Sequence, residues 1–243
     1  MQNKDKHHHR FFVDPKLIQG DFFSSNDKVL INQIKNVFRL KTGSEILILD
    51  NTGYEYVVKI TKLTNNIEGK IVKKIKQKQP EKKINLFCSI LKGDNFEFVL
   101  QKVTELGIAE ITPVIFQNSL KKDIVNKIDR WNKIIKEASE QSMRFFLPEL
   151  NKAVEFGKAI QQVENKFNLV ADQESKINLL KYSEKIRKEK IINIFAGPEG
   201  DFSEKEKEIM VKAGFLFYNL GNNTLRSETA CIASAGIISQ IML

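Results

Sequence analysis

The first third of the chain contains short runs in which apolar and polar residues alternate. Residues 45–50 (EILILD) and 54–61 (YEYVVKIT) are rich in β-branched and aromatic side chains, and Asn51-Thr52-Gly53 between them is a hairpin-turn sequence. Residues 68–75 form a third run of this kind. The pattern predicts a small barrel-like β domain over residues 1–78.

A basic stretch separates this region from the rest of the chain. Residues 73–83 (KKIKQKQPEKK) lack apolar periodicity and contain Pro80, which predicts an exposed linker. We place the boundary between two domains at residues 79–83. The lysines here could also touch RNA, although a solvated hinge accounts for them more simply.

Beyond this linker, short apolar runs alternate with segments of helical spacing. The apolar runs, which are typical of buried parallel strands, lie at 84–91, 111–116, 167–171, 191–196 and 215–220. Strands that alternate with helices predict an α/β domain with a mostly parallel sheet, here over residues 84–243.

The expected helices have recognisable ends. Asp94 with Glu97 predicts the start of one helix, and Gly107 its end. Ser203 with Glu206 forms a capping box at the start of another. Two long helices are expected at 125–143 and 225–243.

Two loops follow predicted strands at the edge where open α/β sheets bind ligands. One is Gly197-Pro198-Glu199-Gly200, and the other covers residues 220–230 (LGNNTLRSETA). Neither matches the glycine patterns of nucleotide hydrolases or dinucleotide enzymes, so those chemistries are disfavoured. By spacing alone, each loop is more often an ordinary strand-to-helix turn than a cofactor site.

Charge adds a modest preference for nucleic acid. Lys and Arg outnumber Asp and Glu by 39 to 30, which gives a formal net charge of +9. A basic surface attracts polyanions. The excess is also explained by a generally Lys-rich composition, so it does not decide the function.

Several features bear on location and on metals. No apolar run reaches the roughly 20 residues that span a bilayer, and residues 1–10 lack the apolar core of a signal peptide, so we expect a cytoplasmic protein. His7-His8-His9 could bind a metal, but a flexible tail or expression remnant is the simpler interpretation. Cys88 and Cys231 lie in apolar surroundings and are expected to be reduced core residues. No metal site is predicted.

The combination of loops is more specific than either alone. The succession GPEG, FSEKE, AGF and LGNNTLRSETA resembles the RsmE family, the bacterial 16S rRNA (uridine-N3)-methyltransferases of the SPOUT superfamily. Other segments agree in order along nearly the whole chain: RFF at 10–12, VFRLKTG at 37–43, Lys92, QKVTELG at 101–107, RW at 130–131, EASEQSMR at 137–144 and Pro148.

This resemblance implies a fold, a cofactor and partners. It implies a PUA-like β-barrel domain that binds RNA, followed by a SPOUT α/β domain with a trefoil knot that forms the cofactor site. The cofactor would be S-adenosylmethionine, and the substrate 16S rRNA or the small ribosomal subunit. A homodimer is also implied. The apolar helix at 225–243 fits a dimer interface, although a monomer core explains it equally well.

The resemblance and the chemistry together suggest catalytic groups. Methylation of uridine N3 requires removal of its proton and stabilisation of the resulting anion. Arg226 is the first candidate for holding that anion or orienting the target. Glu199 and Glu228 are candidates for the base or for cofactor contacts. A helix-start ion pair explains Arg226 and Glu228 without function, and a cap explains Glu199.

The resemblance also implies binding residues. Those expected around the cofactor are Leu169, Gly197, Pro198, Glu199, Gly200, Leu220, Gly221, Leu225, Arg226, Ser227, Thr229 and Ala230. Candidate RNA contacts are Arg10, Arg39, Lys92, Lys102 and Arg144, each of which is otherwise a solvated surface charge.

The chain departs from the family pattern at two places. Gln33 and Ile34 occupy the region where relatives often have a histidine, which disfavours an imidazole function there. Asp201 follows GPEG where a second glycine is common, and it adds a charge and a side chain at the edge of the loop.

Two other functions fit part of the pattern. One is a SPOUT enzyme that methylates a ribose 2′-hydroxyl. The other is a non-catalytic RNA-binding or ribosome-assembly protein, which would keep the basic surface but would not need Arg226 and the loop glycines.

Overall fold

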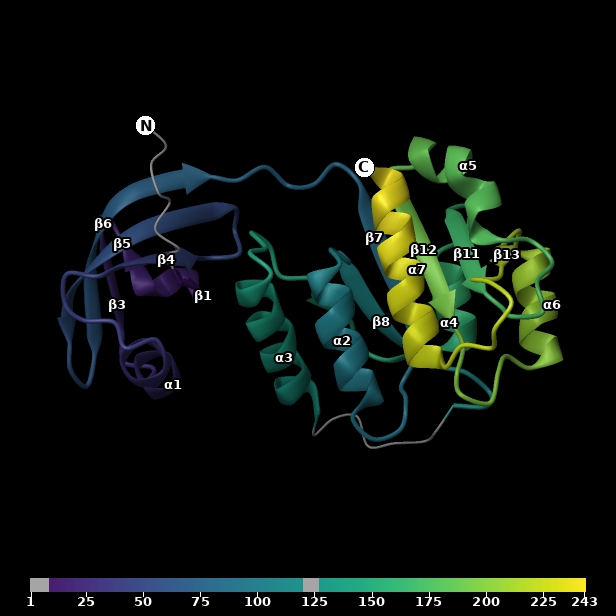
Figure 1. Cartoon of the computed structure of the whole chain (residues 1–243), viewed down its shortest axis with the longest axis horizontal. Helices are drawn as coiled ribbons and strands as arrows, with labels where there is room; N and C mark the ends of the chain where they lie inside the picture. Colours follow the sequence, from purple (N-terminus) through teal and green to yellow (C-terminus); the bar gives the residue numbers. More distant parts are fainter. Residues whose placement is uncertain (1–8, 120–126) are drawn as a thin grey trace. The chain divides into compact units, whose positions relative to one another are not determined.

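The computed structural model describes residues 9–119 and 127–243, which form two compact units (Figure 1). The first unit contains the chain up to Gln79 together with Ser139–Leu147. The second contains Pro80–Ala138 and Pro148–Leu243. The segment Ser139–Leu147 had been expected in the second domain, so the division is not a single cut in the chain.

The first unit is built on a six-stranded sheet. Its strands, in spatial order, are β1 (Arg10–Phe12), β4 (Glu45–Leu49), β5 (Tyr54–Leu63), β6 (Ile67–Lys76), β3 (Phe22–Ser25) and β2 (Ile18–Gln19). β1 and β4 are parallel, and the other pairs are antiparallel. Alternate side chains from these strands, among them Phe11, Ile46 and Val58, form the unit's apolar core.

The hairpin between β4 and β5 forms as expected. Asn51 and Gly53 have positive φ, and the Asp50 carboxylate accepts hydrogen bonds from the backbone N–H groups of Thr52 and Tyr54. The linker prediction was wrong for residues 73–76, which continue β6 and pair with β5. Residues 73–76 extend past the end of β3, so the lysine side chains among them remain exposed. Their exposure hides the alternation of apolar and polar residues by which a strand is recognised in the sequence.

Short helices complete this unit: η1 (Pro15–Leu17), α1 (Lys28–Asn32) and the π-helix η2 (Gln33–Val37). α1 begins at Asp27, whose carboxylate accepts a hydrogen bond from the Val29 N–H. Ile34 is fully buried in the core. This position therefore has a packing function in this chain.

The segment Ser139–Leu147 is fastened to the β strands at three points. Glu140 accepts a hydrogen bond from the Phe12 N–H at 2.8 Å, and the Met143 carbonyl accepts one from Arg10 at 3.0 Å. Asn51 accepts one from the Leu147 N–H at 2.8 Å. The segment is thus an integral part of the first unit.

The second unit is built on a seven-stranded, entirely parallel sheet, which confirms the predicted α/β domain. The strands, in spatial order, are β10 (Val154–Glu155), β8 (Glu110–Ile115), β7 (Lys83–Ser89), β12 (Ile191–Ala196), β11 (Phe167–Ala171) and β13 (Leu216–Tyr218), with β9 (Glu149–Leu150) beside β8.

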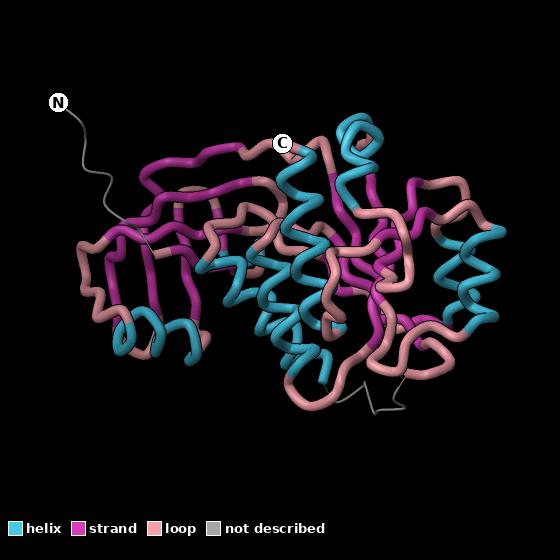
Figure 2. Tube along the Cα trace, turned by 45° about the vertical axis from the view of Figure 1, so that its right-hand side comes forward, coloured by secondary structure: helices cyan, strands magenta, loops and turns pink. Residues whose placement is uncertain are grey.

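Helices cover both faces of this sheet (Figure 2). One apolar core includes side chains from α2 (Asn95–Glu105), α3 (Ile128–Gln141), α5 (Ser183–Lys188) and α7 (Ser227–Met242), with η4 (Leu179–Tyr182). The opposite face packs against α4 (Phe156–Gln162) and α6 (Glu204–Lys212), where Phe87 and Phe195 stack 4.7 Å apart. Both faces are buried, as their continuous apolar runs predict.

Two helix starts differ in how well the sequence predicts them. The capping box of Ser203 and Glu206 is present at the start of α6. Asp94 does stand at the N-cap of α2, but its side chain makes no capping hydrogen bond, and Glu97 instead binds Arg130 at 2.6 Å. Within the described residues, no helix is both long and apolar enough to cross a membrane.

Candidate functional site

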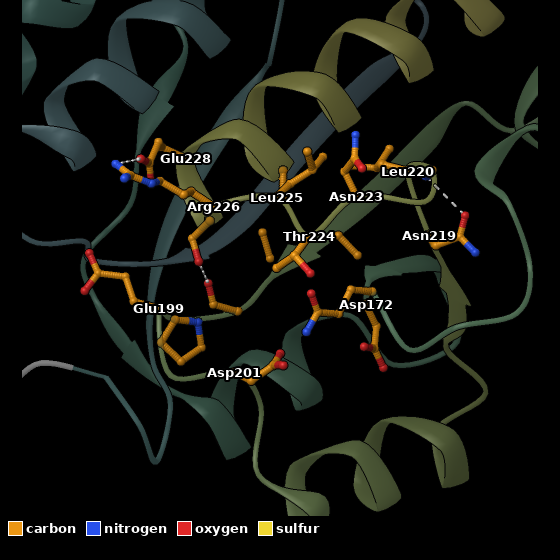
Figure 3. Close-up of a pocket in the computed structure, with 18 of the residues that line it drawn as sticks. Asp172, Glu199, Asp201, Asn219, Leu220, Asn223, Thr224, Leu225, Arg226 and Glu228 are labelled. Carbon is orange, nitrogen blue, oxygen red and sulfur yellow. Dashed lines mark hydrogen bonds and ion pairs between the residues drawn. The ribbon is translucent and has the colours of Figure 1, made fainter.

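A pocket of about 520 Å³ lies at the carboxyl edge of the parallel sheet (Figure 3). Four loops form it: those after β7, β11, β12 and β13. Because all these strands are parallel, their carboxyl ends meet at one edge, and loops far apart in the chain come together there. The first turn of α7 closes one side.

Most of the expected cofactor residues line this pocket. These are Gly197, Pro198, Glu199, Leu220, Gly221, Leu225, Arg226, Ser227 and Ala230, and Glu228 joins them. Three do not line it: Leu169 is fully buried in the core, Thr229 is exposed, and the Gly200 carbonyl accepts a hydrogen bond from Asn118.

Sequence reasoning missed other lining residues. They include Asn95, Asp172, Gln173, Asn219, Asn223 and Thr224, and Lys92, which was expected only as an RNA contact. Asp172 directly follows β11, and Lys92 comes soon after β7. The rule that singled out the other two loops therefore applies to these as well, but β7 and β11 are followed by less distinctive sequences.

The two glycine-containing loops are joined to each other. Ser227, the first residue of α7, donates a hydrogen bond to the Gly197 carbonyl at 2.9 Å. A Cβ atom at Gly197 would lie 3.1 Å from the ring of Phe202. Gly197 therefore lets the chain pass close to a buried aromatic ring while its carbonyl holds the opposite loop.

Glu199 connects its loop to the segment after β7. Its carboxylate accepts a hydrogen bond from the Lys92 N–H at 3.0 Å, and the Lys92 ammonium lies 3.7 Å away. This is a contact between loops, and not the local cap that was the alternative interpretation of Glu199. It commits one carboxylate oxygen to the backbone.

Arg226 and Glu228 form a loose pair at the start of α7, with a separation of 4.0 Å between guanidinium and carboxylate. The Arg226 side chain is 85% exposed, whereas that of Glu228 is 13% exposed. Figure 3 shows both beside the pocket, with Glu199 on the facing loop. An exposed guanidinium next to a shielded carboxylate can bind one molecule that enters the pocket from outside.

Asp201 adopts a backbone conformation that favours glycine. Its φ is +64°, in the left-handed region that Asp tolerates better than most residues. Asp is therefore an acceptable residue at a position where glycine would be free of strain. Its carboxylate accepts a hydrogen bond from the Phe202 N–H at 3.2 Å.

Lys207 of α6 binds acidic residues beside the pocket. Its ammonium lies 2.6 Å from Glu174 and 3.5 Å from Asp172, whose side chain is nearly buried. Burial alone would lower the pKa of Lys207. The hydrogen bond to Glu174 and the charges of Asp172 and Asp201 outweigh that effect and raise the pKa overall. Lys207 thus keeps its charge at neutral pH and ties α6 to the carboxyl end of β11.

The candidate RNA contacts lie in different environments. Arg39 and Lys92 are exposed. Lys102 pairs with Glu105 at 2.9 Å. The Arg10 side chain is 15% exposed, lies 3.4 Å from Glu55, and stacks over Phe145. Burial lowers the pKa of Arg144 to about 10, and its side chain donates to the Phe146 carbonyl.

Cysteines and metal ligands contribute little to the site. Cys88 and Cys231 are buried and unbridged, and a hydrogen bond with Cys231 together with burial raises the pKa of Cys88. Within residues 9–119 and 127–243, no cluster of His, Cys, Asp and Glu has the arrangement of a metal site. His7 and His8 lie outside the described residues; His9 stacks on Phe38.

Comparison with known families identifies both units. The family described as RNA methyltransferase domain matches residues 77–239, and the family described as RNA methyltransferase PUA domain matches residues 34–72. The first match covers the pocket and all the loops that build it. The second match lies within the first unit, the one with the six-stranded sheet.

Individual relatives match over nearly their full length. The chain is 34% identical to ribosomal RNA small subunit methyltransferase E of Mesomycoplasma hyopneumoniae, over 92% of this chain and 96% of that protein. Among solved structures, the enzyme of the same name from Neisseria gonorrhoeae, bound to S-adenosyl methionine, is similar with a TM-score of 0.86 and 27% identity, covering 96% and 98% of the two chains. A putative methyltransferase from Legionella pneumophila, in complex with the same cofactor, gives a TM-score of 0.87 at 25% identity, covering 97% and 98%.

Proposed function

This chain belongs to the ribosomal RNA small subunit methyltransferase E family, and on that basis we propose that it methylates N3 of a uridine in 16S rRNA, with S-adenosylmethionine as the methyl donor. The observation that carries the proposal is the pocket at the carboxyl edge of the sheet, built from the GPEG loop and the loop of residues 220–230. We place the cofactor in this pocket.

The pocket suits this cofactor in size and charge. A volume of about 520 Å³ is within the range of small-molecule sites. Glu199, Asp201 and Glu228 line it, and their carboxylates complement a cationic ligand. When bound, the cofactor supplies an electrophilic methyl group on a sulfonium that leaves as a neutral thioether, so the reaction requires no metal. Leu220 and Leu225 offer apolar surface to a base.

We assign complementary tasks to the pair at the start of α7. Arg226 is exposed enough to reach a substrate and hold the uracil oxygens as negative charge develops on them. Glu228 is shielded and lies beside Arg226, so it is the better candidate for accepting the N3 proton. Glu199 contacts Lys92 through its carboxylate and is better suited to position the loop.

A carboxylate base can be tested through the pH profile. Replacement Glu228→Gln is expected to lower turnover roughly 100-fold at neutral pH, and saturating cofactor should not restore it. Because a uridine that has already lost its proton needs no base, the loss should shrink as pH rises. Glu199→Gln serves as the comparison. Equal losses in both variants with no pH rescue in either would remove Glu228 as the base.

The wider assembly is also part of this proposal. The first unit would hold rRNA or the small ribosomal subunit through the exposed Arg39 and the partly engaged Arg10 and Arg144. Lys92 and Lys102 are candidate RNA contacts on the second unit. We include a homodimer in this proposal, with α7 as the candidate interface, because small residues on this helix would let another helix approach closely. The trefoil knot and a cytoplasmic location are expected from the family.

Two alternatives make different demands on the site. A ribose 2′-O-methyltransferase would use the same cofactor pocket but deprotonate a hydroxyl. A non-catalytic RNA-binding protein would need neither the joined glycine loops nor the exposed Arg226. The joined loops therefore favour an enzyme.

One experiment separates these functions. Purified protein is incubated with labelled S-adenosylmethionine and small ribosomal subunits from cells that lack this modification, and the product nucleoside is identified by mass spectrometry. N3-methyluridine is expected. A ribose-methylated nucleoside would replace the proposed chemistry, and RNA binding without transfer would reject an enzyme.

A further inference from the structure

A second polar site lies at the opposite edge of the parallel sheet from the pocket. Three asparagines occupy neighbouring positions on adjacent strands: Asn85 on β7, Asn193 on β12 and Asn168 on β11. Their exposed fractions are 9%, 1% and 3%. Each is near the amino end of its strand, whereas the cofactor pocket lies beyond the carboxyl ends.

The three amides form a chain of hydrogen bonds with one direction. Asn168 donates to the Val163 carbonyl at 2.9 Å, Asn193 donates to Asn168 at 2.8 Å, and Asn85 donates to Asn193 at 3.1 Å. The Val163 carbonyl can only accept, so it fixes the orientation of every amide. Aligned hydrogen bonds polarise one another, which makes the last oxygen a stronger acceptor.

That last oxygen is the Oδ1 atom of Asn85, and it has no hydrogen-bond partner among the described residues. A buried acceptor without a donor destabilises a fold, so native structures rarely retain one without a reason. Asn85 lines a cavity of about 500 Å³, as does Glu110, its neighbour in strand register. Two acceptors therefore lie side by side on the inner wall.

The rest of the cavity has a different character. Phe87, Val154 and Val163 supply apolar surface. Lys152 and Lys166 also line the cavity, and Lys152 is exposed. A ligand that matches this arrangement has a planar, hydrogen-bond-donating end and an anionic end.

We propose that this cavity binds a nucleotide whose base carries an exocyclic amino group, such as cytidine or adenosine monophosphate. The amino group donates to Asn85 and Glu110, the base contacts Phe87, and the phosphate lies near Lys152. The same chemistry is presented by a free nucleotide and by a nucleotide within an RNA strand. The inference does not depend on methyl transfer at the other edge of the sheet.

Calorimetric titration of the full-length protein with cytidine and uridine monophosphates tests the proposal. Saturating S-adenosylhomocysteine is included to occupy the cofactor pocket. The cytidine nucleotide is expected to bind about tenfold more tightly than the uridine nucleotide, which presents an oxygen in place of the amino group. Equal affinities for the two nucleotides would overturn the proposal. It would also be overturned if neither nucleotide bound and a short oligocytidylate did not bind either.

Variants locate the binding. Lys152→Ala should weaken cytidine monophosphate binding about threefold or more and Glu110→Gln should reduce the preference for cytidine, whereas Lys158→Ala, an equal charge change on α4 outside the cavity, should do neither. These substitutions lie outside the apolar core, and circular dichroism checks their folding. Unchanged binding in both cavity variants would refute the site.

A parallel titration with oligocytidylate distinguishes the two sources. Binding of the mononucleotide that the Lys152→Ala change weakens indicates a site for free nucleotides. Binding of the oligonucleotide alone, weakened by the same change, indicates a contact with an RNA strand. Either result supports the site. Because neither titration measures methylation, failure of this proposal can be distinguished from failure of the proposed enzymatic function.

Discussion

The two edges of the parallel sheet carry polar residues in different ways. At the carboxyl edge, charged side chains such as Arg226 and Glu199 stand on loops and contact one another across open space. At the amino edge, Asn85, Asn193 and Asn168 lie within the strands and are buried. The first arrangement can adapt to a ligand, whereas the second is fixed by the register of the sheet.

This difference predicts which substitutions affect activity and which affect folding. Loop side chains at the carboxyl edge can be removed at little expense to the core, because few of their contacts are buried. A buried amide cannot be removed without leaving its partners unsatisfied. Removal of a side chain at the carboxyl edge should therefore lower activity and leave stability nearly unchanged. Removal of a buried amide at the amino edge should lower stability.

The largest expected effect is on turnover, at the carboxyl edge. Arg226→Ala should lower the rate of methyl transfer about 100- to 1,000-fold, since it removes the group proposed to stabilise the developing anion. Thermal unfolding should hardly change, because the side chain is 85% exposed. Arg187→Ala, an exposed arginine on α5, is the matched control and should retain full activity. A comparable loss in both variants would contradict the assignment.

At the amino edge, the central amide should matter most for stability. Asn193→Ala leaves the Asn85 amide group and the Asn168 oxygen without partners, so the free energy of unfolding should fall by about 3 kcal/mol. Urea denaturation measures this. Replacement of all three asparagines by leucine removes every unpaired group and should cost less than the single change. A larger loss in the triple variant would show that the amides stabilise the fold as a network.

A substitution at Gly197 tests whether the loop after β12 can move away from the buried ring of Phe202. Gly197→Ala places a Cβ 3.1 Å from the Phe202 ring and should lower the free energy of unfolding by about 1–2 kcal/mol. Gly157→Ala on α4, where the added Cβ meets no atom within 4 Å, should be neutral or slightly stabilising. Similar stabilities of the two variants would mean that the loop adjusts freely.

The smallest effect is expected at Asp201. Glycine has no steric penalty at a φ of +64°, so Asp201→Gly should raise the free energy of unfolding by at most about 1 kcal/mol. The loss of its hydrogen bond to the Phe202 N–H partly offsets this gain. Chemical denaturation measures this free energy. A clear decrease would show that the hydrogen bond of the Asp201 side chain contributes more to stability than the backbone strain costs.

Two of the four loops at the carboxyl edge were predictable from the sequence, because the signals that mark them are local. The GPEG loop and residues 220–230 each follow an apolar strand, and the capping box at Ser203 is readable within four residues. The strands β12 and β13 lie where their apolar runs predicted, although β13 is shorter.

The amino edge was not predicted because its meaning depends on strand register. Asn85, Asn193 and Asn168 each stand between apolar residues, in INLF, INIF and FNLV. The repeated pattern is a signal that could have been recognised. It shows that three buried amides exist, but only the pairing of β7, β12 and β11 shows that they touch. Long-range contacts of this kind are absent from local periodicity.

The segment Ser139–Leu147 has a consequence for how the chain folds during synthesis. The first unit requires Glu140, Met143 and Leu147 for contacts with β1 and the β4–β5 hairpin, yet these residues are made long after the strands themselves. The β unit therefore cannot complete its contacts until residue 147 has left the ribosomal exit tunnel. By then, β7, α2 and β8 of the second unit have already emerged, so the two units mature as interleaved parts of one process.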